Sequence, residues 1–236
     1  MKVMKMIKIV SFKICPFVQR VTAALEAKNV PYEIEYIDLK NKPQWFLEIS
    51  PNAQVPVLIT EKDTVLFESD AIIEYIDDEF SPLETSLSNE VRALDRAWSY
   101  LATKHYLAQC STMSSKDEAT FKKRSLKLEK AFKTIEQQLA ANTVFFKSDT
   151  LSKVDIAWLP LLHRAAIIKA HSGYDFLCGL PKAQAWQQNV LNSDLVEKTI
   201  SDDFTKRFSQ FYLTNTFLAN NKDVQSSLCS TNSCCN

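Results

Sequence analysis

The first strand and helix of the fold are predicted from the stretch Lys8-Ile9-Val10-Ser11-Phe12-Lys13-Ile14-Cys15-Pro16-Phe17. The apolar residues of its first half predict a short strand over 8–12. Proline is favoured at the first position of a helix, because its φ is already helical and its missing N–H is not needed there. Pro16 therefore starts a predicted helix that runs to Asn29, and Cys15 lies at the join between strand and helix.

The alternation of strand and helix continues to about residue 80. The apolar-polar repeat of Tyr32–Ile37 is typical of a half-buried strand, and a hairpin-length connection at 61–63 joins two further strands. The other predicted elements are a helix over Pro43–Ile49, strands over Pro56–Ile59 and Thr64–Phe67, and a helix from Ser69. The order β-α-β-α-β-β-α predicts an α/β unit, a mixed sheet with helices packed against it.

Residues 88–220 have helical spacing throughout, and the Ser/Pro-rich stretch 81–88 reads as a linker. Ser115 with Glu118, and Ser152 with Asp155, fit capping boxes at helix starts. The predicted helices are Asn89–Cys110, Lys116–Ala141, a segment containing Ile156–Ile168, Pro181–Leu191 and Asp202–Ala219. We therefore expect one domain over residues 1–80, an all-helical domain over 88–220 and a disordered tail over 221–236, with a ligand groove between the two domains.

Composition excludes several functions. The 236 residues carry 28 Lys+Arg and 28 Asp+Glu, so there is no basic surplus of the kind that binds nucleic acid. Only two glycines occur, which excludes a Gly-rich nucleotide loop. The longest apolar stretches fall far short of the ~20 residues that span a bilayer, and the first ten residues lack the apolar core of a secretory signal. We expect a cytoplasmic protein that binds neither nucleic acid nor a membrane.

The six cysteines do not form a disulfide scaffold or a zinc-binding spacing, so no metal site is expected. Cys229, Cys234 and Cys235 lie in the polar tail, where their role stays open. Most of the six read as small apolar residues or tail thiols.

Cys15 is the exception. As the residue before a helix it faces unpaired N–H groups and the positive end of the helix dipole, which favour a thiolate and predict a pKa below the usual value of about 8.5. The alternative is a buried structural cysteine that happens to precede a proline. Val18 occupies the position of a second cysteine in a CxxC pair, so redox chemistry needs a thiol from outside, and glutathione is the abundant cytosolic one.

Three further features suit a glutathione site. The backbone of Val55 can pair with an extended peptide if Pro56 follows a cis bond. Ser69 as an N-cap leaves amides free for a carboxylate, and Glu68 can hold an ammonium group. Lys42 can meet the second carboxylate. Each of these residues can also have a purely structural role: Pro56 can simply start a strand, Glu68-Ser69 can simply cap a helix, and Lys42 can be a solvated surface lysine. Their joint occurrence with Cys15 favours a glutathione site.

At this point the chain resembles the glutathione transferase superfamily, in its omega-like, cysteine-containing class. The resemblance covers about residues 6–215 and rests on motifs in order: Ile14-Cys15-Pro16-Phe17, Leu39–Phe46, Val55-Pro56-Val57-Leu58, Phe67–Tyr75 and the Ser152/Asp155 helix start. It implies a thioredoxin-like N-terminal domain, a helical C-terminal domain, a homodimer, and glutathione as co-substrate without a metal.

The resemblance also assigns roles. Cys15 forms a mixed disulfide with glutathione, Phe17 and Leu39 line the site, and Lys42 contacts the glycine carboxylate. Val55 pairs through its backbone, Pro56 is the cis proline, and Glu68 and Ser69 hold the γ-glutamyl end. The second-substrate pocket is expected to involve Arg164, Phe204, Phe208 and Phe211, although aromatic residues at helical spacing also occur simply as core.

The implied activity is that of a thioltransferase and dehydroascorbate reductase with weak conjugation, acting on a small electrophilic, oxidised or glutathionylated substrate. Two alternatives stay open. One is a non-enzymatic regulator of the stringent-starvation type, whose members lack the thiol that this chain keeps. The other is a transferase that conjugates or isomerises compounds in a catabolic pathway.

Overall fold

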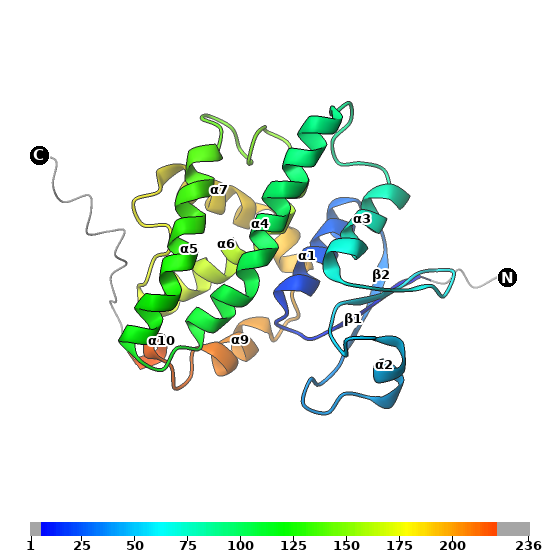
Figure 1. The fold of residues 1–236 in the computed structure, drawn as a ribbon, viewed down its shortest axis with the longest axis horizontal. Helices are drawn as coiled ribbons and strands as arrows, with labels where there is room; N and C mark the ends of the chain where they lie inside the picture. The colour runs from blue at the N-terminus through cyan, green and yellow to red at the C-terminus, as the bar shows by residue number, and fades with distance from the viewer. Residues whose placement is uncertain (1–5, 221–236) are drawn as a thin grey trace, which may run out of the picture.

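The computed structural model describes residues 6–220 of the 236-residue chain, so the expected tail and its three cysteines lie outside the described residues. A small sheet with three helices lies beside a larger helical part (Figure 1). The elements of the first part are β1 (Ile7–Ser11), α1 (Pro16–Ala27), β2 (Tyr32–Tyr36), α2 (Gln44–Ile49), β3 (Val57–Ile59), β4 (Val65–Phe67) and α3 (Ser69–Glu79). This is the predicted order, with boundaries within about two residues of those expected for the strands and α1.

The four strands lie in the order β2-β1-β3-β4. β1 pairs with β2 in parallel and with β3 in antiparallel, and β3 pairs with β4 in antiparallel, which confirms the mixed sheet. Because side chains alternate across a strand, Ile9 and Leu58 lie in the main core, which α1 and α3 share, whereas Val10 and Val57 contact Phe46 of α2 on the other face. The N-terminal unit is thus a thioredoxin-like sheet with helices on both faces.

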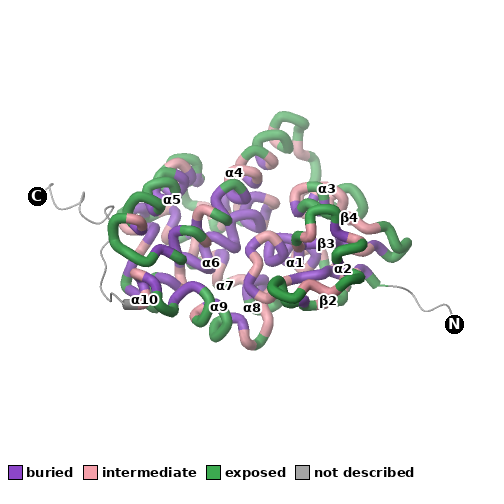
Figure 2. Tube along the Cα trace, turned by 60° about the horizontal axis from the view of Figure 1, so that its bottom comes forward, coloured by how far each residue is buried: buried purple, intermediate pink, exposed green. Residues whose placement is uncertain are grey.

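The helical part is built around a buried central helix. It consists of α4 (Asn89–Met113), α5 (Glu118–Gln138), α6 (Lys153–Ser172), α7 (Pro181–Asn192), α8 (Leu195–Lys198), α9 (Phe204–Tyr212) and α10 (Phe217–Asn220). α6 is buried on nearly its whole circumference, as expected of an apolar helix inside a bundle. Figure 2 shows that the buried segments lie inside the helical part, whereas the outer faces of α5 and α9 are exposed.

One helix start and one long helix differ from the sequence-based expectation. The Ser152/Asp155 capping box is confirmed, but the Ser115/Glu118 box is wrong: Asp117 caps α5 through the backbone N–H of Thr120. The single helix expected over 202–219 is divided into α9 and α10, because Asn215 between them has a φ of 56° and a left-handed residue ends a helix. None of the described helices is both long and apolar enough to cross a membrane.

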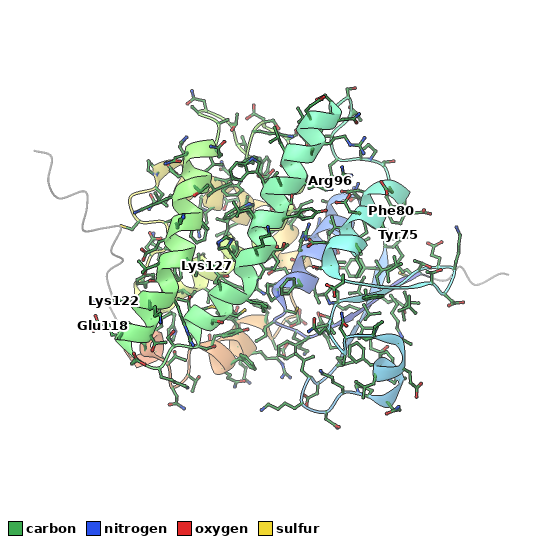
Figure 3. All side chains as sticks on the ribbon, in the orientation of Figure 1. Tyr75, Phe80, Arg96, Glu118, Lys122 and Lys127 are labelled. Carbon is green, nitrogen blue, oxygen red and sulfur yellow. The ribbon has the colours of Figure 1, made fainter. Side chains whose placement is uncertain are left out.

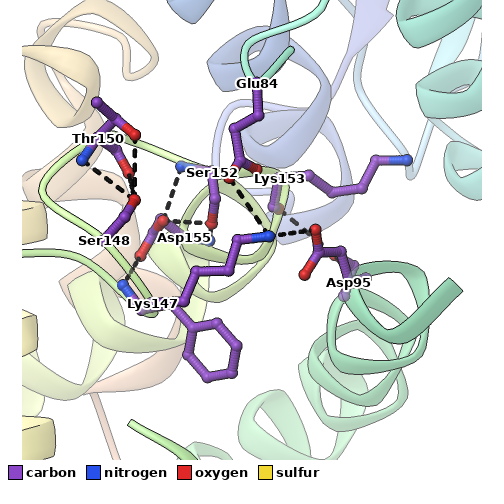
Figure 4. A network of polar contacts seen from close by, with 10 residues as sticks. Glu84, Asp95, Lys147, Ser148, Thr150, Ser152, Lys153 and Asp155 are labelled. Atoms are coloured by element: carbon purple, nitrogen blue, oxygen red, sulfur yellow. Dashed lines mark hydrogen bonds and ion pairs between the residues drawn. The ribbon is translucent and has the colours of Figure 1, made fainter. Parts of the chain in front are cut away.

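Ion pairs join the sheet unit, the loop at 80–88 and the helical part. Glu74 of α3 meets Arg96 of α4 at 2.9 Å and Lys153 of α6 at 3.2 Å. Arg96 lies beside the end of α3, near Tyr75 and Phe80 (Figure 3). Lys147 lies between Glu84 of the loop and Asp95 of α4, at 3.3 and 2.5 Å (Figure 4). These contacts hold the two units in the arrangement that forms the site described next.

Candidate active site

Cys15 is the N-cap of α1, as expected, and Pro16 occupies the first turn of the helix. A turn in which the Cys15 N–H donates to the carbonyl of Phe12 at 2.9 Å brings the chain from β1 into α1. The thiol is free and half-buried. The next residue but one, Phe17, packs edge-on against Tyr106 of α4, with ring centroids 5.0 Å apart. Cys15 therefore lies where the sheet unit meets the helical part.

The pKa of the Cys15 thiol is shifted in the direction opposite to the one that its place at a helix start predicts. Burial raises the pKa of the thiol to about 11, and the backbone N–H groups of Val18 and Phe17 and the charge of Arg164 lower it by less than burial raises it. The expectation of a depressed pKa is therefore wrong. The N–H groups at the helix start do lower the pKa, as expected. The loss of water around the sulfur destabilises the thiolate by more than these groups stabilise it.

This pKa has a measurable consequence. A thiol whose pKa is about 11 is protonated at neutral pH, so its reaction with iodoacetamide should become about tenfold faster for each pH unit between 7 and 10. Alkylation of the Ile14–Arg20 tryptic peptide, followed by mass spectrometry over this range, measures the dependence. A rate that levels off below pH 8 contradicts it and restores the depressed pKa.

The sheet topology places the predicted glutathione residues along one edge of the sheet, the edge at which β1, β2 and β4 end and β3 begins. β1 and β2 run in parallel, so the segments that follow them, which carry Cys15 and Lys42, leave the sheet at the same edge. In the antiparallel register Val10 faces Val57, and Val57 faces Phe67, so the start of β3 and the end of β4 lie there too. These points carry Val55 and Glu68.

Val55 and Pro56 are joined by a cis peptide bond, as the sequence analysis expected. Glu68 rather than Ser69 is the N-cap of α3, and Glu68 has a φ of 65°. A non-glycine residue in this conformation costs about 1 kcal/mol or more, and such strain is concentrated at ligand sites. Ser69 is the first residue of α3, so its N–H still belongs to the first turn, whose amides lack helical partners.

The two charged residues of the expected site both have partners within the chain. Lys42 Nζ donates to the carbonyl oxygen of Ala53 at 2.8 Å, just before the cis bond. Asn52 Nδ2 donates to Glu68 Oε1 at 2.9 Å. Asn52 was not singled out from the sequence; its proximity to Glu68 is a long-range contact that no local pattern encodes.

A cavity of about 690 Å³ adjoins the Cys15 loop. Its apolar lining includes Leu39 and the rings of Phe12 and Phe211, whose centroids are 6.0 Å apart. Phe211 is 55% exposed, but Arg164, Phe204 and Phe208 are fully buried and do not line this cavity. Of the four residues expected around a second substrate, the structure thus brings only Phe211 to the open cavity; the two other aromatic residues belong to the core.

Arg164 instead supports the Cys15 loop from behind. Its guanidinium donates to the carbonyl oxygen of Ile14 at 3.0 Å and to Gln19 Oε1 of α1 at 2.5 Å. Residue 14 directly precedes the thiol, so this buried cation fixes the backbone that carries Cys15. Arg164 was predicted to line a second-substrate pocket; its support of the Cys15 backbone was not predicted, because neither partner is visible in a local motif.

The polar wall of the cavity was also missed. Lys13 and Arg207 both bind the Asp203 carboxylate, at 3.0 and 2.5 Å, which holds the pKa of Asp203 well below its usual range. Lys13 also lies 5.4 Å from the centroid of the Tyr36 ring. Lys13, Tyr36 and Arg207 line the cavity between the β1–α1 loop and α9. In residues 6–220 no group of three or more His, Cys, Asp or Glu side chains is placed to hold a metal ion.

Family models and known proteins similar to this chain point to one family. The family model "Glutathione S-transferase, N-terminal domain" matches residues 14–79, and "Glutathione S-transferase, C-terminal domain" matches residues 125–188. The chain is 29% identical over 188 residues to a probable glutathione S-transferase DHAR2, chloroplastic, of Oryza sativa subsp. japonica, covering 79% of this chain but only 65% of that protein. It is 27% identical over 214 residues to glutathione S-transferase omega-1 of Sus scrofa, covering 89% and 87% of the two chains.

Among solved structures, glutathione transferase Omega 3C from Trametes versicolor matches with a TM-score of 0.74 at 22% identity, over 88% of this chain and 90% of that one. At this identity the likeness concerns the fold. The fold, the two family matches and the free thiol at the start of α1 agree with one another.

Proposed function

Because the chain belongs to the glutathione S-transferase family, we propose that it is a glutathione-dependent thioltransferase of the dehydroascorbate-reductase type, with weak conjugating activity. The observation that carries the proposal is the free Cys15 thiol at the start of α1, beside the sheet edge that carries Lys42, Val55 and Glu68. A tyrosine- or serine-dependent conjugating enzyme needs no cysteine at this point.

The reaction proceeds by two thiol–disulfide exchanges. The Cys15 sulfur attacks the glutathione sulfur of a glutathionylated substrate, the substrate thiol leaves, and the proton of Cys15 passes to that leaving sulfur. A second glutathione then attacks the glutathione sulfur of the mixed disulfide, which releases oxidised glutathione and restores the Cys15 thiol. Each exchange breaks one S–S bond and forms another, so no outside oxidant or reductant besides glutathione is needed.

The raised pKa of Cys15 lowers the exchange rate by less than the fall in its thiolate fraction. The shift from 9.0 to about 11 lowers the thiolate fraction at neutral pH about a hundredfold. Nucleophilicity rises with pKa with a Brønsted slope of about 0.5, which returns a factor of about ten. The remaining penalty of about tenfold is small beside the effective molarities that positioning supplies. Positioning of glutathione is therefore the main catalytic contribution of the site.

In this proposal the sheet edge holds glutathione. The Val55 backbone pairs with the cysteinyl residue, Glu68 and the Ser69 amide hold the γ-glutamyl end, and Lys42 binds the glycine carboxylate. Phe17 and Leu39 flank the ligand, and Phe211 faces the second substrate across the cavity. The strained conformation of Glu68 supports its role, because backbone strain of this kind clusters at ligand sites.

The lysine contact gives a direct test. Lys42→Ala should weaken glutathione binding about tenfold, because a charge-assisted hydrogen bond to a half-buried group is lost. Lys62→Ala is the matched control, since Lys62 is an exposed lysine on the turn between β3 and β4. Isothermal titration of Cys15→Ser variants carrying each change measures the two affinities without mixed-disulfide formation. Equal affinities in the two variants would remove Lys42 from the site.

The activity itself is tested by running two assays side by side. Reduction of a glutathionylated peptide should be much faster than conjugation of chlorodinitrobenzene, because a thiol that attacks disulfides does not activate the glutathione sulfur as a nucleophile. Faster conjugation favours the catabolic transferase. Failure to bind immobilised glutathione favours the non-enzymatic regulator.

We further propose that the unit of residues 1–80 and the helical unit of 88–220 are the two domains of a cytoplasmic homodimer. A glutathione-dependent thiol suits a compartment with a reducing glutathione pool. The exposed leucines of α4 and α5, Leu94, Leu107 and Leu126, are 59 to 65% accessible and are candidates for a dimer contact. Light scattering on the purified protein measures the assembly, and a monomer mass at micromolar concentration overturns the dimer.

A further inference from the structure

A second free thiol, Cys110, lies on α4 close to the candidate site. It is half-buried, and the Tyr212 hydroxyl of α9 donates to its sulfur at 3.3 Å. Neither the Cys15 motif nor the proposed exchange reactions use it. The hydrogen bond from Tyr212 holds the Cys110 sulfur between α4 and α9.

Both thiols act electrostatically on the same buried cation, Arg164. Arg164 is fully buried, and the hydrogen bonds that it makes within the described chain go to neutral oxygens, those of Ile14, Gln19 and Pro160. Its Nε has no hydrogen-bond partner among residues 6–220. A buried charge without an anionic partner is costly. Burial lowers the pKa of Arg164, and the groups that act in the opposite direction are Cys110, Tyr212, Cys15 and Tyr106.

Packing brings the two cysteines toward each other. Arg164 is bonded to the backbone of the residue before Cys15. Phe17, two residues after Cys15, contacts Tyr106 of α4. Tyr106 and Cys110 are four residues apart on that helix, so they share a face that is turned toward the start of α1. The electrostatic effect of Cys110 on Cys15 agrees with this proximity.

We propose that Cys110 is a resolving thiol, which converts the Cys15–glutathione mixed disulfide into an internal Cys15–Cys110 disulfide. This inference rests on the proposed function. The Cys110 sulfur attacks Cys15 Sγ, the bond between Cys15 and glutathione breaks, and the glutathione sulfur leaves with the electron pair and takes the proton of Cys110. Two further glutathione molecules reduce the internal disulfide and are released as oxidised glutathione. Arg164 offsets the negative charge that passes between the sulfurs.

Non-reducing peptide mapping after treatment with oxidised glutathione tests the proposal. In the unaltered protein, the peptide of Cys15 should be joined to that of Cys110, with little glutathione retained on Cys15. In Cys110→Ser the adduct on Cys15 should accumulate at least about fivefold relative to the unaltered protein. Ser111→Ala, next to Cys110 but on another side of the helix, is the matched control and should behave like the unaltered protein.

The two proposals fail in different ways. Retention of the glutathione adduct on Cys15 at the same level in the unaltered protein and in Cys110→Ser, with no joined peptide, overturns the resolving role and leaves the mixed disulfide intact. An absence of any adduct on Cys15 in a folded Cys110→Ser protein overturns the proposed function and this inference together. The thermal unfolding midpoint of each variant verifies that it is folded.

Discussion

Cys15→Ala is expected to lower the rate of glutathionylated-peptide reduction by a factor of about 10³ or more, because the sulfur that forms the covalent intermediate is removed. The fold should tolerate the change, since Cys15 makes no side-chain cap to α1. The rate of glutathione release, followed with a coupled reductase assay, measures the effect.

Cys15→Ser is the matched variant, because it keeps the size and polarity of the side chain while removing the thiol. It should lose the exchange activity to the same extent and keep its affinity for glutathione, because binding depends on the sheet edge. Exchange activity within about twofold of the unaltered protein in either variant would contradict the account.

Asp155→Ala is expected to produce the largest loss of stability, about 3–5 kcal/mol in the free energy of unfolding. The carboxylate is fully buried at the start of α6. Oδ1 accepts hydrogen bonds from the Phe146 N–H at 2.8 Å and the Trp186 indole at 2.6 Å. Oδ2 accepts the N–H of Ser152 at 2.8 Å and its hydroxyl at 2.5 Å, as Figure 4 shows. Alanine leaves all four donors buried without partners.

Two controls sharpen this prediction. Asp155→Asn keeps one acceptor oxygen and should lose roughly half as much stability. Asp117→Ala removes the exposed cap of α5 and should have a much smaller effect, because water replaces the lost partner. Urea unfolding of the three variants gives the comparison, and equal midpoints for Asp155→Ala and Asp117→Ala would contradict it.

Much of this architecture was predictable because it depends on local signals. The alternation of Tyr32–Ile37 and the proline at position 16 determine elements that need no distant partner. The Ser152/Asp155 spacing identified a cap whose two partners are three residues apart. The cis bond at Pro56 was anticipated from the position of the proline at a strand start together with the resemblance.

The errors arise where a distant contact outweighs a local signal. The helix start does favour a thiolate at Cys15, but burial against the helical part raises its pKa to about 11. Arg164 looks like a ligand-binding cation in sequence, whereas its partners are Gln19, 145 positions away, and Ile14, 150 positions away. Phe204 and Phe208 have the same helical spacing whether they face a substrate or the core.

The central claim is that glutathione is carried on the sulfur of Cys15, at the meeting point of the sheet and the helical part. Its most direct test is a single turnover of Cys110→Ser, in which no internal disulfide with Cys15 can form, with one equivalent of glutathionylated peptide, quenched in acid within the first turnover and mapped by mass spectrometry. The account predicts that glutathione appears on the Ile14–Arg20 peptide as the peptide thiol is released. Glutathione found only on other cysteines, with Cys15 unmodified while the peptide is reduced, would contradict it.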